Sequence, residues 1–491
     1  MKVKLSLLFI IAILTMIAGG CMKRSVHPGN GGGNSTGNEN GNPTNKKPPV
    51  ANAGSDQTIT IVTSNTTASL NGSNSHDSSG MPLQFTWRQI SGPSNCSLQT
   101  PSQTQCMVYN LYTPGIYSFE LKVWNMNGVD FDTTDISVLR PSYCGANREE
   151  VAVGLTFLSD VPGQIQNPEI IVAGNKLVIP AWFSNHTGLI SNNIYLYDRI
   201  DQNWTTIQAS KARIGVTTIA AGNKIFFAGG VDTYDDNYTA TSVVDIYDLS
   251  TNSWSVANLS EARGYCKAVV AAGKVFFAGG LKNNEVLSNK IDVYNLETNS
   301  WSTAQLPSGA RQVGAALSVL DKVLFCGGYT RYDDPTGFGN VFTTPTTNID
   351  IYDINTGQWT VSTMLVNKGS FAAVGINDKV YIAGGMVNYA ATFHVEEINV
   401  NTMNSSSSCL HQPMICDNDK CAVVKNDIVL FFTYSPVSGI ERNKFDIYNM
   451  QTGAWSIGVL PPESSTTYTA IASVNNEIYT VINNKLYKMN L

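Results

Sequence analysis

The chain has 491 residues, of which 43% are hydrophobic and only 14% are charged. This length exceeds that of one ordinary domain, so at least two folded units are expected. The formal net charge of −6 is small, and the region after the first fifty residues contains no basic run, which argues against a nucleic-acid-binding protein.

The first twenty residues have the pattern of an export signal. Two lysines precede an apolar segment, 5–17, which is too short to span a membrane comfortably. Small residues and Cys21 follow, and they resemble the lipobox of bacterial lipoproteins, although Ala18 stands where that motif usually has Leu. The resemblance implies that 1–20 are removed and that Cys21 is acylated, which predicts a lipid-anchored protein at the bacterial outer membrane or cell surface. An ordinary signal peptide with an incidental cysteine is the alternative.

Residues 21–47 are rich in Gly, Asn, Ser and Thr, with almost no apolar side chain available for a core. Such a composition predicts a flexible tether. Its role would be to hold the folded part away from the membrane in which Cys21 is embedded.

From residue 48 to about 140, short segments such as 83–87 and 117–124 alternate apolar and polar side chains. Alternation predicts antiparallel strands with one buried face, and roughly ninety residues with turns between strands suit a β-sandwich. Four motifs occur in order: ANAGSDQ at 51–57, LNGS at 70–73, WRQISGP at 87–93 and GIY at 115–117. Together they resemble a PKD domain of bacterial surface proteins, which implies an immunoglobulin-like sandwich that acts as a spacer or adhesion module.

Two acidic residues of this segment, Asp56 and Asp77, stand near Asn and Ser in predicted turns. Oxygen-rich turns can bind calcium, so calcium is the one cofactor considered for the chain. The alternative is that both carboxylates cap turns by accepting backbone hydrogen bonds.

The sequence has nine cysteines, and an even number remains once Cys21 is set aside, which suits disulfides in an exported protein. Cys96 and Cys106 flank a short segment of the predicted sandwich, so we expect them to pair. One further pair is expected within the cluster of Cys409, Cys416 and Cys421, for which zinc binding is less favoured because only His411 stands close. The sequence leaves the partners of Cys144, Cys266 and Cys326 open.

The remainder, 150–491, contains an internal repeat of about 50 residues. In each repeat an apolar run ends in Gly-Gly, a run such as Val-Asp-Ile-Tyr follows, and a tryptophan comes next. The glycine pairs are 229–230, 279–280, 327–328 and 384–385, and the tryptophans are Trp204, Trp254, Trp301, Trp359 and Trp455. This order resembles the kelch repeat, which forms one four-stranded blade of a β-propeller. The resemblance implies that these residues pack the blades rather than bind a ligand.

The repeats, together with weaker strand pairs near 176–179, 428–432 and 477–481, predict seven blades, with six as the alternative. The last blade has only three predicted strands, and the strand-like segment 151–158 can supply the fourth. Closing the ring in this way removes exposed sheet edges. The predicted fold class is therefore all-β, a kelch-type β-propeller preceded by an immunoglobulin-like β-sandwich.

A basic residue stands just before the first strand of four successive blades: Arg213, Arg263, Arg311 and Lys368. In kelch proteins this position lies near the mouth of the central channel, so the resemblance implies a positive ring that receives an acidic peptide or a sugar acid. The alternative is that these side chains hydrogen-bond the backbone of neighbouring blades.

Two longer loops carry Tyr-Asp-Asp just after a glycine pair, with Tyr234 and Asp235 in one loop and Tyr332 and Asp333 in the other. They are candidate ligand-contact or calcium-binding residues. Solvated turns also favour Asp, which is the plainer interpretation.

For the function, a binding protein is favoured over an enzyme. We expect the propeller face to bind a glycan or protein at the cell surface. The alternative is a carbohydrate-active enzyme of the kelch type, because such folds include galactose oxidase, which holds copper with histidines and tyrosines, and the bacterial N-acetylneuraminate epimerase. The propeller has only His186, His394 and His411, in no matching arrangement, so no catalytic residue and no metal site are predicted.

Overall fold

The computed structural model describes residues 47–61, 66–111, 113–141, 144, 148–165, 168–182, 191–232, 239–283, 286–330, 332–333, 341–342, 344–387, 390–416, 420–432, 441–462 and 469–491. The predicted signal segment, Cys21 and nearly all of the tether lie outside these residues. The named elements are all strands. Within the described part of the chain, no helix is long and apolar enough to cross a membrane.

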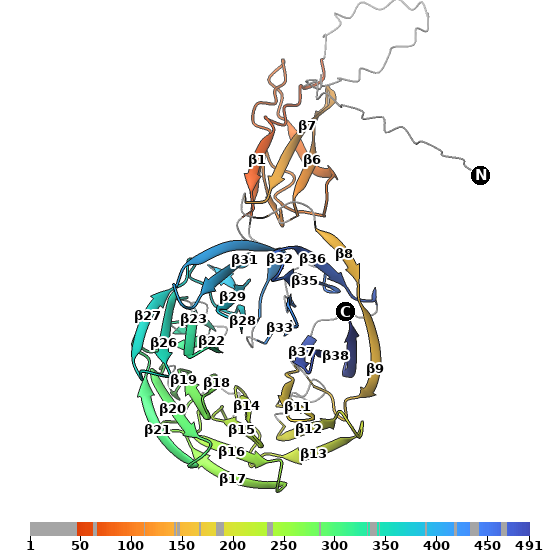
Figure 1. The fold of residues 1–491 in the computed structure, drawn as a ribbon. Coiled ribbons are helices and arrows are strands. Elements are labelled where there is room, and N and C mark those ends of the chain that lie inside the picture. Colours follow the sequence, from red (N-terminus) through yellow and green to blue (C-terminus); the bar gives the residue numbers. More distant parts are fainter. Residues whose placement is uncertain are drawn as a thin grey trace, which may run out of the picture. The chain divides into compact units, whose positions relative to one another are not determined.

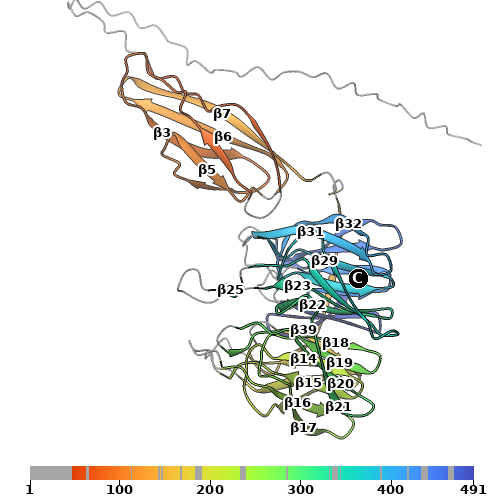
Figure 2. The same ribbon diagram turned by 90° about the vertical axis from the view of Figure 1, so that its left-hand side faces the viewer.

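The N-terminal β-domain consists of two sheets around one core (Figure 2). One sheet has the order β1 (Gln57–Thr60), β7 (Gly128–Leu139), β6 (Gly115–Asn125) and β3 (Gln84–Ser91), and the other has the order β2 (Ala68–Asn71), β5 (Gln105–Tyr109) and β4 (Ser97–Gln99). The alternation of β6 decides which side chains enter the core, because Tyr117, Phe119 and Leu121 are fully buried and the residues between them are not. Trp87 from β3 packs in the same core.

Asp56 and Asp77 of this domain accept hydrogen bonds from nearby groups. Asp56 Oδ1 accepts from the backbone N–H of Asp135 at 2.9 Å, and Asp77 Oδ1 accepts from the N–H of Ser79 at 2.8 Å. The bonds to Ser79 and Asn125 hold the pKa of Asp77 well below its usual range. The Asp77 contact is that of a carboxylate that orders a turn, whereas Asp56 joins its segment to strand β7.

The expected disulfide between Cys96 and Cys106 does not form, because both residues are free thiols. The register explains this correction. Strand β4 pairs with β5 so that Gln99 lies opposite Met107, which places Cys106 several residues along the strand from Cys96. The disulfides of the described residues are Cys416–Cys421, which confirms a pair within the predicted cluster, and Cys144–Cys409.

The C-terminal part is a ring of successive antiparallel sheets, the blades, whose first strands lie innermost (Figure 1). The first blades are β10 (Ile171–Ala173), β11 (Lys176–Pro180), β12 (Asn193–Asp198) and β13 (Trp204–Gln208); β14 (Thr217–Ala221), β15 (Lys224–Ala228), β16 (Val243–Asp248) and β17 (Ser253–Asn258); and β18 (Lys267–Ala271), β19 (Lys274–Ala278), β20 (Lys290–Asn295) and β21 (Ser300–Gln305). The next is β22 (Gln312–Val319), β23 (Lys322–Tyr329), β26 (Asn348–Asp353) and β27 (Trp359–Thr363).

The ring continues with β28 (Ala372–Ile376), β29 (Lys379–Ala383), β31 (Ala390–Asn399) and β32 (Ser405–Met414), to which the short β30 (Met386–Val387) is added through β31. The last blades are β33 (Ala422–Lys425), β34 (Ile428–Phe431), β35 (Lys444–Asn449) and β36 (Trp455–Val459), and then β37 (Thr469–Val474), β38 (Glu477–Ile482) and β39 (Lys485–Asn490). Each blade is named below by its first strand.

The segment that follows the N-terminal domain closes the ring. Strand β8 (Glu149–Ala152) pairs in parallel with β36, and β9 (Gly154–Asp160) pairs antiparallel with β39 and becomes the fourth strand of the β37 blade. Leu155 lies opposite Met489, in agreement with the expectation that 151–158 supplies the missing strand. The ring is thus held together by strands from both ends of the propeller sequence.

The repeated glycines and aromatic residues lie where the kelch resemblance implies. Gly279 has a φ of +64°, and a Cβ there would meet the carbonyl oxygen of Arg311 in the next blade at 2.5 Å, so only glycine allows the two blades to approach. Tyr294 and Trp301 pack within one blade with ring centroids 5.0 Å apart. Tyr294 also lies 5.1 Å from the ring of Phe226 in the preceding blade, which joins the two blades.

Candidate functional site

Three of the predicted ligand-binding cations have no exposed surface, because Arg213, Arg263 and Arg311 are all 0% exposed. Each lies beside an aspartate on the third strand of its own blade. The donor–acceptor distances are 2.5 Å from Arg213 to Asp245, 2.7 Å from Arg263 to Asp292 and 2.6 Å from Arg311 to Asp350. Each guanidinium also donates to carbonyl oxygens of the second strand, as Arg311 does to Phe325 at 2.9 Å. These arginines therefore fasten the strands of a blade.

Lys368 occupies the same position in the β28 blade and is also 0% exposed. Its Nζ donates to the carbonyl oxygens of Ile382 at 3.1 Å and His394 at 3.0 Å, and it lies 3.4 Å from His394 Nδ1. Burial lowers the pKa of Lys368 to about 7. Burial and the charge of Lys368 lower the pKa of His394 to about 3, so the imidazole is neutral at pH 7.

The expectation that these four cations form a solvent-facing ring is corrected by their burial. A ligand in the channel would meet none of their atoms, and their charges are already engaged by carboxylates or carbonyl oxygens of the blades. Hydrogen bonding within the blades, the alternative that the sequence left open, is the arrangement that their contacts support.

The two Tyr-Asp-Asp loops lie largely outside the described residues. Tyr234 and Asp235 are not among them, and Tyr332 and Asp333 are described only as the short strand β24 (Tyr332–Asp333), which pairs with β25 (Val341–Phe342). A ligand-binding role for these residues stays a prediction.

The antiparallel order of the strands divides the loops of the propeller between two faces. The connection from the second to the third strand and the connection to the next blade lie on one face, which we call the loop face, and the tight turns lie on the other face. The loop face is therefore where the first strand of every blade begins, after a connection such as 209–216.

A cavity of about 300 Å³ lies among the first strands of the β10, β14 and β18 blades. Its walls are mostly apolar, and Lys420 reaches it from the beginning of the β33 blade; the lining residues are Ile170, Ile171, Val172, Thr218, Ile219, Ala220, Ala268, Val270 and Lys420. Ile170 and Lys420 precede the first strands of their blades, whereas Ala220 and Val270 lie near the far ends of theirs, so the cavity runs along the inner strands from the loop face. We call it the channel-mouth site.

The charged part of the channel-mouth site is an ion pair between Lys420 and Glu169, which precede the first strands of two different blades. Lys420 Nζ also donates to the carbonyl oxygen of Thr218 at 3.3 Å. The hydroxyl of Thr218 is buried and has no hydrogen-bond partner among the residues that the structure describes. The site thus combines apolar walls with a few polar groups, which is the usual make-up of a binding site.

A disulfide fixes the beginning of the β33 blade next to Lys420. Cys416 and Cys421 are bonded, the N–H of Cys416 donates to the carbonyl oxygen of Ser370 at 2.7 Å, and the N–H of Phe432 donates to that of Cys421 at 2.7 Å. Sequence reasoning missed Lys420 because it belongs to no repeated position. Its place beside a clustered cysteine was the one available signal.

The histidines of the propeller sequence do not gather in the part of the propeller that the structure describes. His394 bonds to Ser407 at 3.0 Å, His411 Nδ1 lies 2.7 Å from Asp446 Oδ2, and His186 is outside the described residues. Across the described ranges, no group of three or more His, Cys, Asp or Glu side chains is placed to hold a metal ion.

Comparisons with known proteins agree with both parts of the fold. Residues 53–139 match a family model for a PKD domain, and residues 212–258 and 262–305 match the Kelch motif. A solved structure titled "Structure of YjhT" is similar with a TM-score of 0.43 and 15% sequence identity, over 68% of this chain and 100% of that chain. No curated protein matches. The family matches and the sheet order together show a PKD domain followed by a β-propeller with kelch motifs, a fold whose repeats suggest protein binding.

Proposed function

We propose that this protein is an exported surface protein, anchored through a lipid on Cys21, whose seven-bladed propeller binds a protein ligand at the channel-mouth site. The tether at 21–47 and an immunoglobulin-like PKD sandwich would serve as the spacer between membrane and propeller. Kelch motifs favour a protein as the ligand, and a glycan is the other ligand class to be tested.

The observation that supports this site is the combination of Lys420 and Glu169 with apolar walls. Lys420 keeps 37% of its side chain exposed despite its ion pair, so a ligand could contact this side chain. An acidic side chain of a peptide would compete with Glu169 for Lys420, while a neighbouring apolar side chain would contact Ile219 and Val270.

The binding test uses the chain from residue 22 on peptide and glycan arrays, with Lys420→Ala compared against Lys425→Ala. Lys425 is a matched control because it ends β33, the strand that Lys420 precedes, on the opposite face, where it donates to the carbonyl oxygen of Leu491 at 3.0 Å. We expect Lys420→Ala to weaken binding of peptides about tenfold or more and Lys425→Ala to leave it unchanged. Equal binding by both variants would rule out the channel-mouth site as the place of binding. Binding to glycans alone would change the proposed ligand class from protein to glycan.

The anchor is tested separately by labelling cells with a palmitate analogue. The intact chain should take up the label and fractionate with membranes, and Cys21→Ser should do neither. A labelled Cys21→Ser protein, or an unlabelled intact chain, would contradict lipid anchoring and leave the binding proposal standing.

A further inference from the structure

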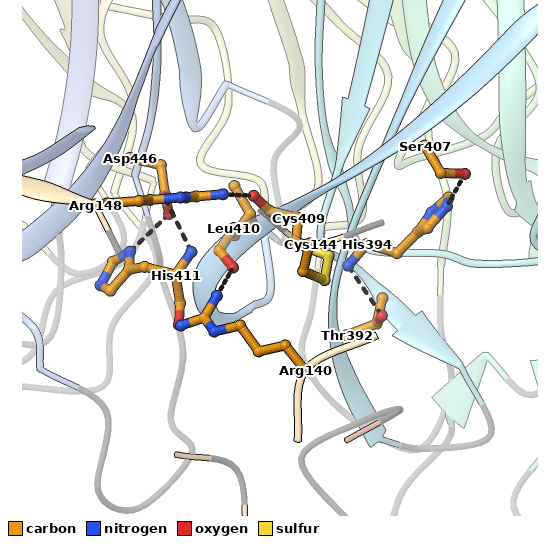
Figure 3. The surroundings of a disulfide bond; sticks show 10 residues. All are labelled: Arg140, Cys144, Arg148, Thr392, His394, Ser407, Cys409, Leu410, His411 and Asp446. Carbon is orange, nitrogen blue, oxygen red and sulfur yellow. Dashed lines mark hydrogen bonds and ion pairs between the residues drawn. A yellow bond between two sulfur atoms is a disulfide. The ribbon is translucent and has the colours of Figure 1, made fainter. Parts of the chain in front are cut away.

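We call the segment from Arg140 to Asp160 the strap, of which the structure describes residues 140, 141, 144 and 148–160. Arg140, Cys144 and Arg148 fasten it to the fourth strand of the β28 blade (Figure 3). Cys144 forms a disulfide with Cys409 in β32. Arg140 donates to the carbonyl oxygens of Leu410 at 3.3 Å and His411 at 2.9 Å. Arg140 and Cys144 therefore both hold the same short stretch of β32, residues 409–411.

The strap also supplies a charge that the β33 blade would otherwise lack. Asp446 lies opposite Phe431, the register position that Asp350 holds opposite Phe325 in the β22 blade. In the β22 blade the partner of the aspartate is Arg311, which comes from the loop just before that blade. Asp446 instead bonds to Arg148 of the strap.

Further contacts fix Arg148 and Asp446 in place. Arg148 donates to the carbonyl oxygen of Cys409, and its guanidinium lies 4.5 Å from the ring centroid of Trp455. Asp446 also accepts from the backbone N–H of His411 at 2.9 Å. Arg148 therefore joins the β28 and β33 blades through groups of both.

Beyond Arg148 the strap continues along the next two blades. Its residues 149–152 pair in parallel with β36, the N–H of Val153 donates to the carbonyl oxygen of Val459 at 2.9 Å, and its residues 154–160 pair with β39. The strap thus contacts the outer strands of three consecutive blades: through a disulfide on the first, and through strand pairing on the second and third.

From this order of contacts we infer that the strap is a redox-dependent lock. Its disulfide transmits a force applied at the N-terminal side directly to β32. The strand pairing of β8 and β9, which closes the ring, is thereby protected from that force. The disulfide comes before both strands in the chain. A pull on residue 140 therefore reaches Cys409 through a covalent bond before it loads β8, which has four residues, all exposed. Without the disulfide, the same pull would peel β8 from β36 and then β9 from β39, and the ring would open.

Formation of the lock is an oxidation. The thiols of Cys144 and Cys409 lose two protons and two electrons as the S–S bond forms, and a thiol–disulfide oxidant such as oxidised glutathione accepts them and becomes two thiols. The lock does not depend on what the propeller binds, so its test is separate from that of the proposed function.

The test pulls single molecules of the chain from residue 22 between handles ligated to its two ends, in oxidised form and after treatment with dithiothreitol. Two variants, Cys144→Ser and Cys416→Ser/Cys421→Ser, are compared with the unchanged chain. In the oxidised chain the loop between Cys144 and Cys409, with a sequence separation of 265, stays closed. We expect its full extension to be shorter by roughly 90 nm than that of the reduced chain.

The decisive observation is whether β8 and β9 come away from the N-terminal side at low force. We expect this early release in the reduced chain and in Cys144→Ser, and not in the oxidised chain or in oxidised Cys416→Ser/Cys421→Ser. Because the C-terminal handle loads β39 directly, unpairing of β39 is expected in every form and does not count as opening of the strap. Reduction of the folded, unsubstituted chain gives the same comparison if Cys144→Ser does not fold. An early opening of equal force in oxidised and reduced chains, or peptide mapping that finds Cys144 as a free thiol in the oxidised chain, would overturn the lock.

Discussion

At the scale of single residues, buried cations recur at one position of successive blades. Arg213, Arg263 and Arg311 lie in the same position of successive blades, each beside an aspartate and away from solvent. A buried ion pair contributes little net stability compared with apolar residues of equal volume, but the loss of one partner leaves an uncompensated charge. The repetition of the pair therefore makes every one of these blades sensitive to substitution of a single residue.

The first prediction concerns Arg263. Replacing it by Met leaves Asp292 buried without its cation, and we expect the free energy of unfolding of the propeller to fall by about 3–5 kcal/mol. Lys211→Met is the control, because Lys211 forms an exposed ion pair with Asp232 at 2.7 Å and should cost less than about 1 kcal/mol. Urea unfolding followed by tryptophan fluorescence measures both, and a similar loss in the two variants would contradict the role of burial.

The second prediction concerns the pH dependence that Lys368 confers. Burial lowers its pKa from 10.5 to about 7, so between these values the unfolded chain binds more protons than the folded chain. The contribution of Lys368 to the free energy of unfolding should therefore rise as the pH increases from 7 to 10 and stay constant below 7. The groups that face it are His394, which is neutral in this range, and Glu396, whose charge partly opposes the shift.

The measurement is the difference in free energy of unfolding between the unchanged chain and Lys368→Met, taken at several pH values. Between pH 7 and 10, the free energy of unfolding of the unchanged chain should increase relative to that of Lys368→Met. A difference that is constant over this range would mean that Lys368 keeps an ordinary pKa when folded.

At the scale of elements, the glycine pairs determine how closely blades approach. Gly279 and Gly273 lie at the two ends of β19 and both have positive φ, +64° and +69°. A Cβ on Gly279 would meet the backbone of the next blade, whereas a Cβ on Gly273 has nothing within 4 Å. A comparison of the same substitution at the two positions therefore separates the energetic cost of backbone strain from that of a clash between blades.

The third prediction follows from this pair. Both Gly279→Ala and Gly273→Ala should lose about 1 kcal/mol from the left-handed backbone, and Gly279→Ala should lose roughly 1–3 kcal/mol more because the adjoining blade must shift. Thermal unfolding of the two variants under identical conditions checks this, with equal midpoints as the contrary result.

Elements that recur in the sequence could be predicted, and contacts set by ring closure could not. The Gly-Gly, Tyr and Trp positions and the closing strand around Leu155 follow from a repeat with constant offsets. Short sequence separation suggested a bond between Cys96 and Cys106, but strand register decides which side chains meet. Cys144 meets Cys409 only because the strap, which precedes the first blade in sequence, packs against β32, a strand far along the chain. The burial of Arg213 depends on its ion pair with Asp245, which belongs to a different strand.

At the scale of the whole molecule, the ring is closed twice, by strand pairing of β9 with β39 and by the Cys144–Cys409 disulfide. A disulfide that joins residues so far apart in sequence restricts the unfolded chain strongly, with a contribution of about 2–5 kcal/mol. The same bond has a consequence for damaged molecules. A protease that cuts once anywhere between residues 144 and 409 leaves two fragments that remain covalently joined, so the two fragments of a nicked propeller can separate only after a reductant cleaves the disulfide.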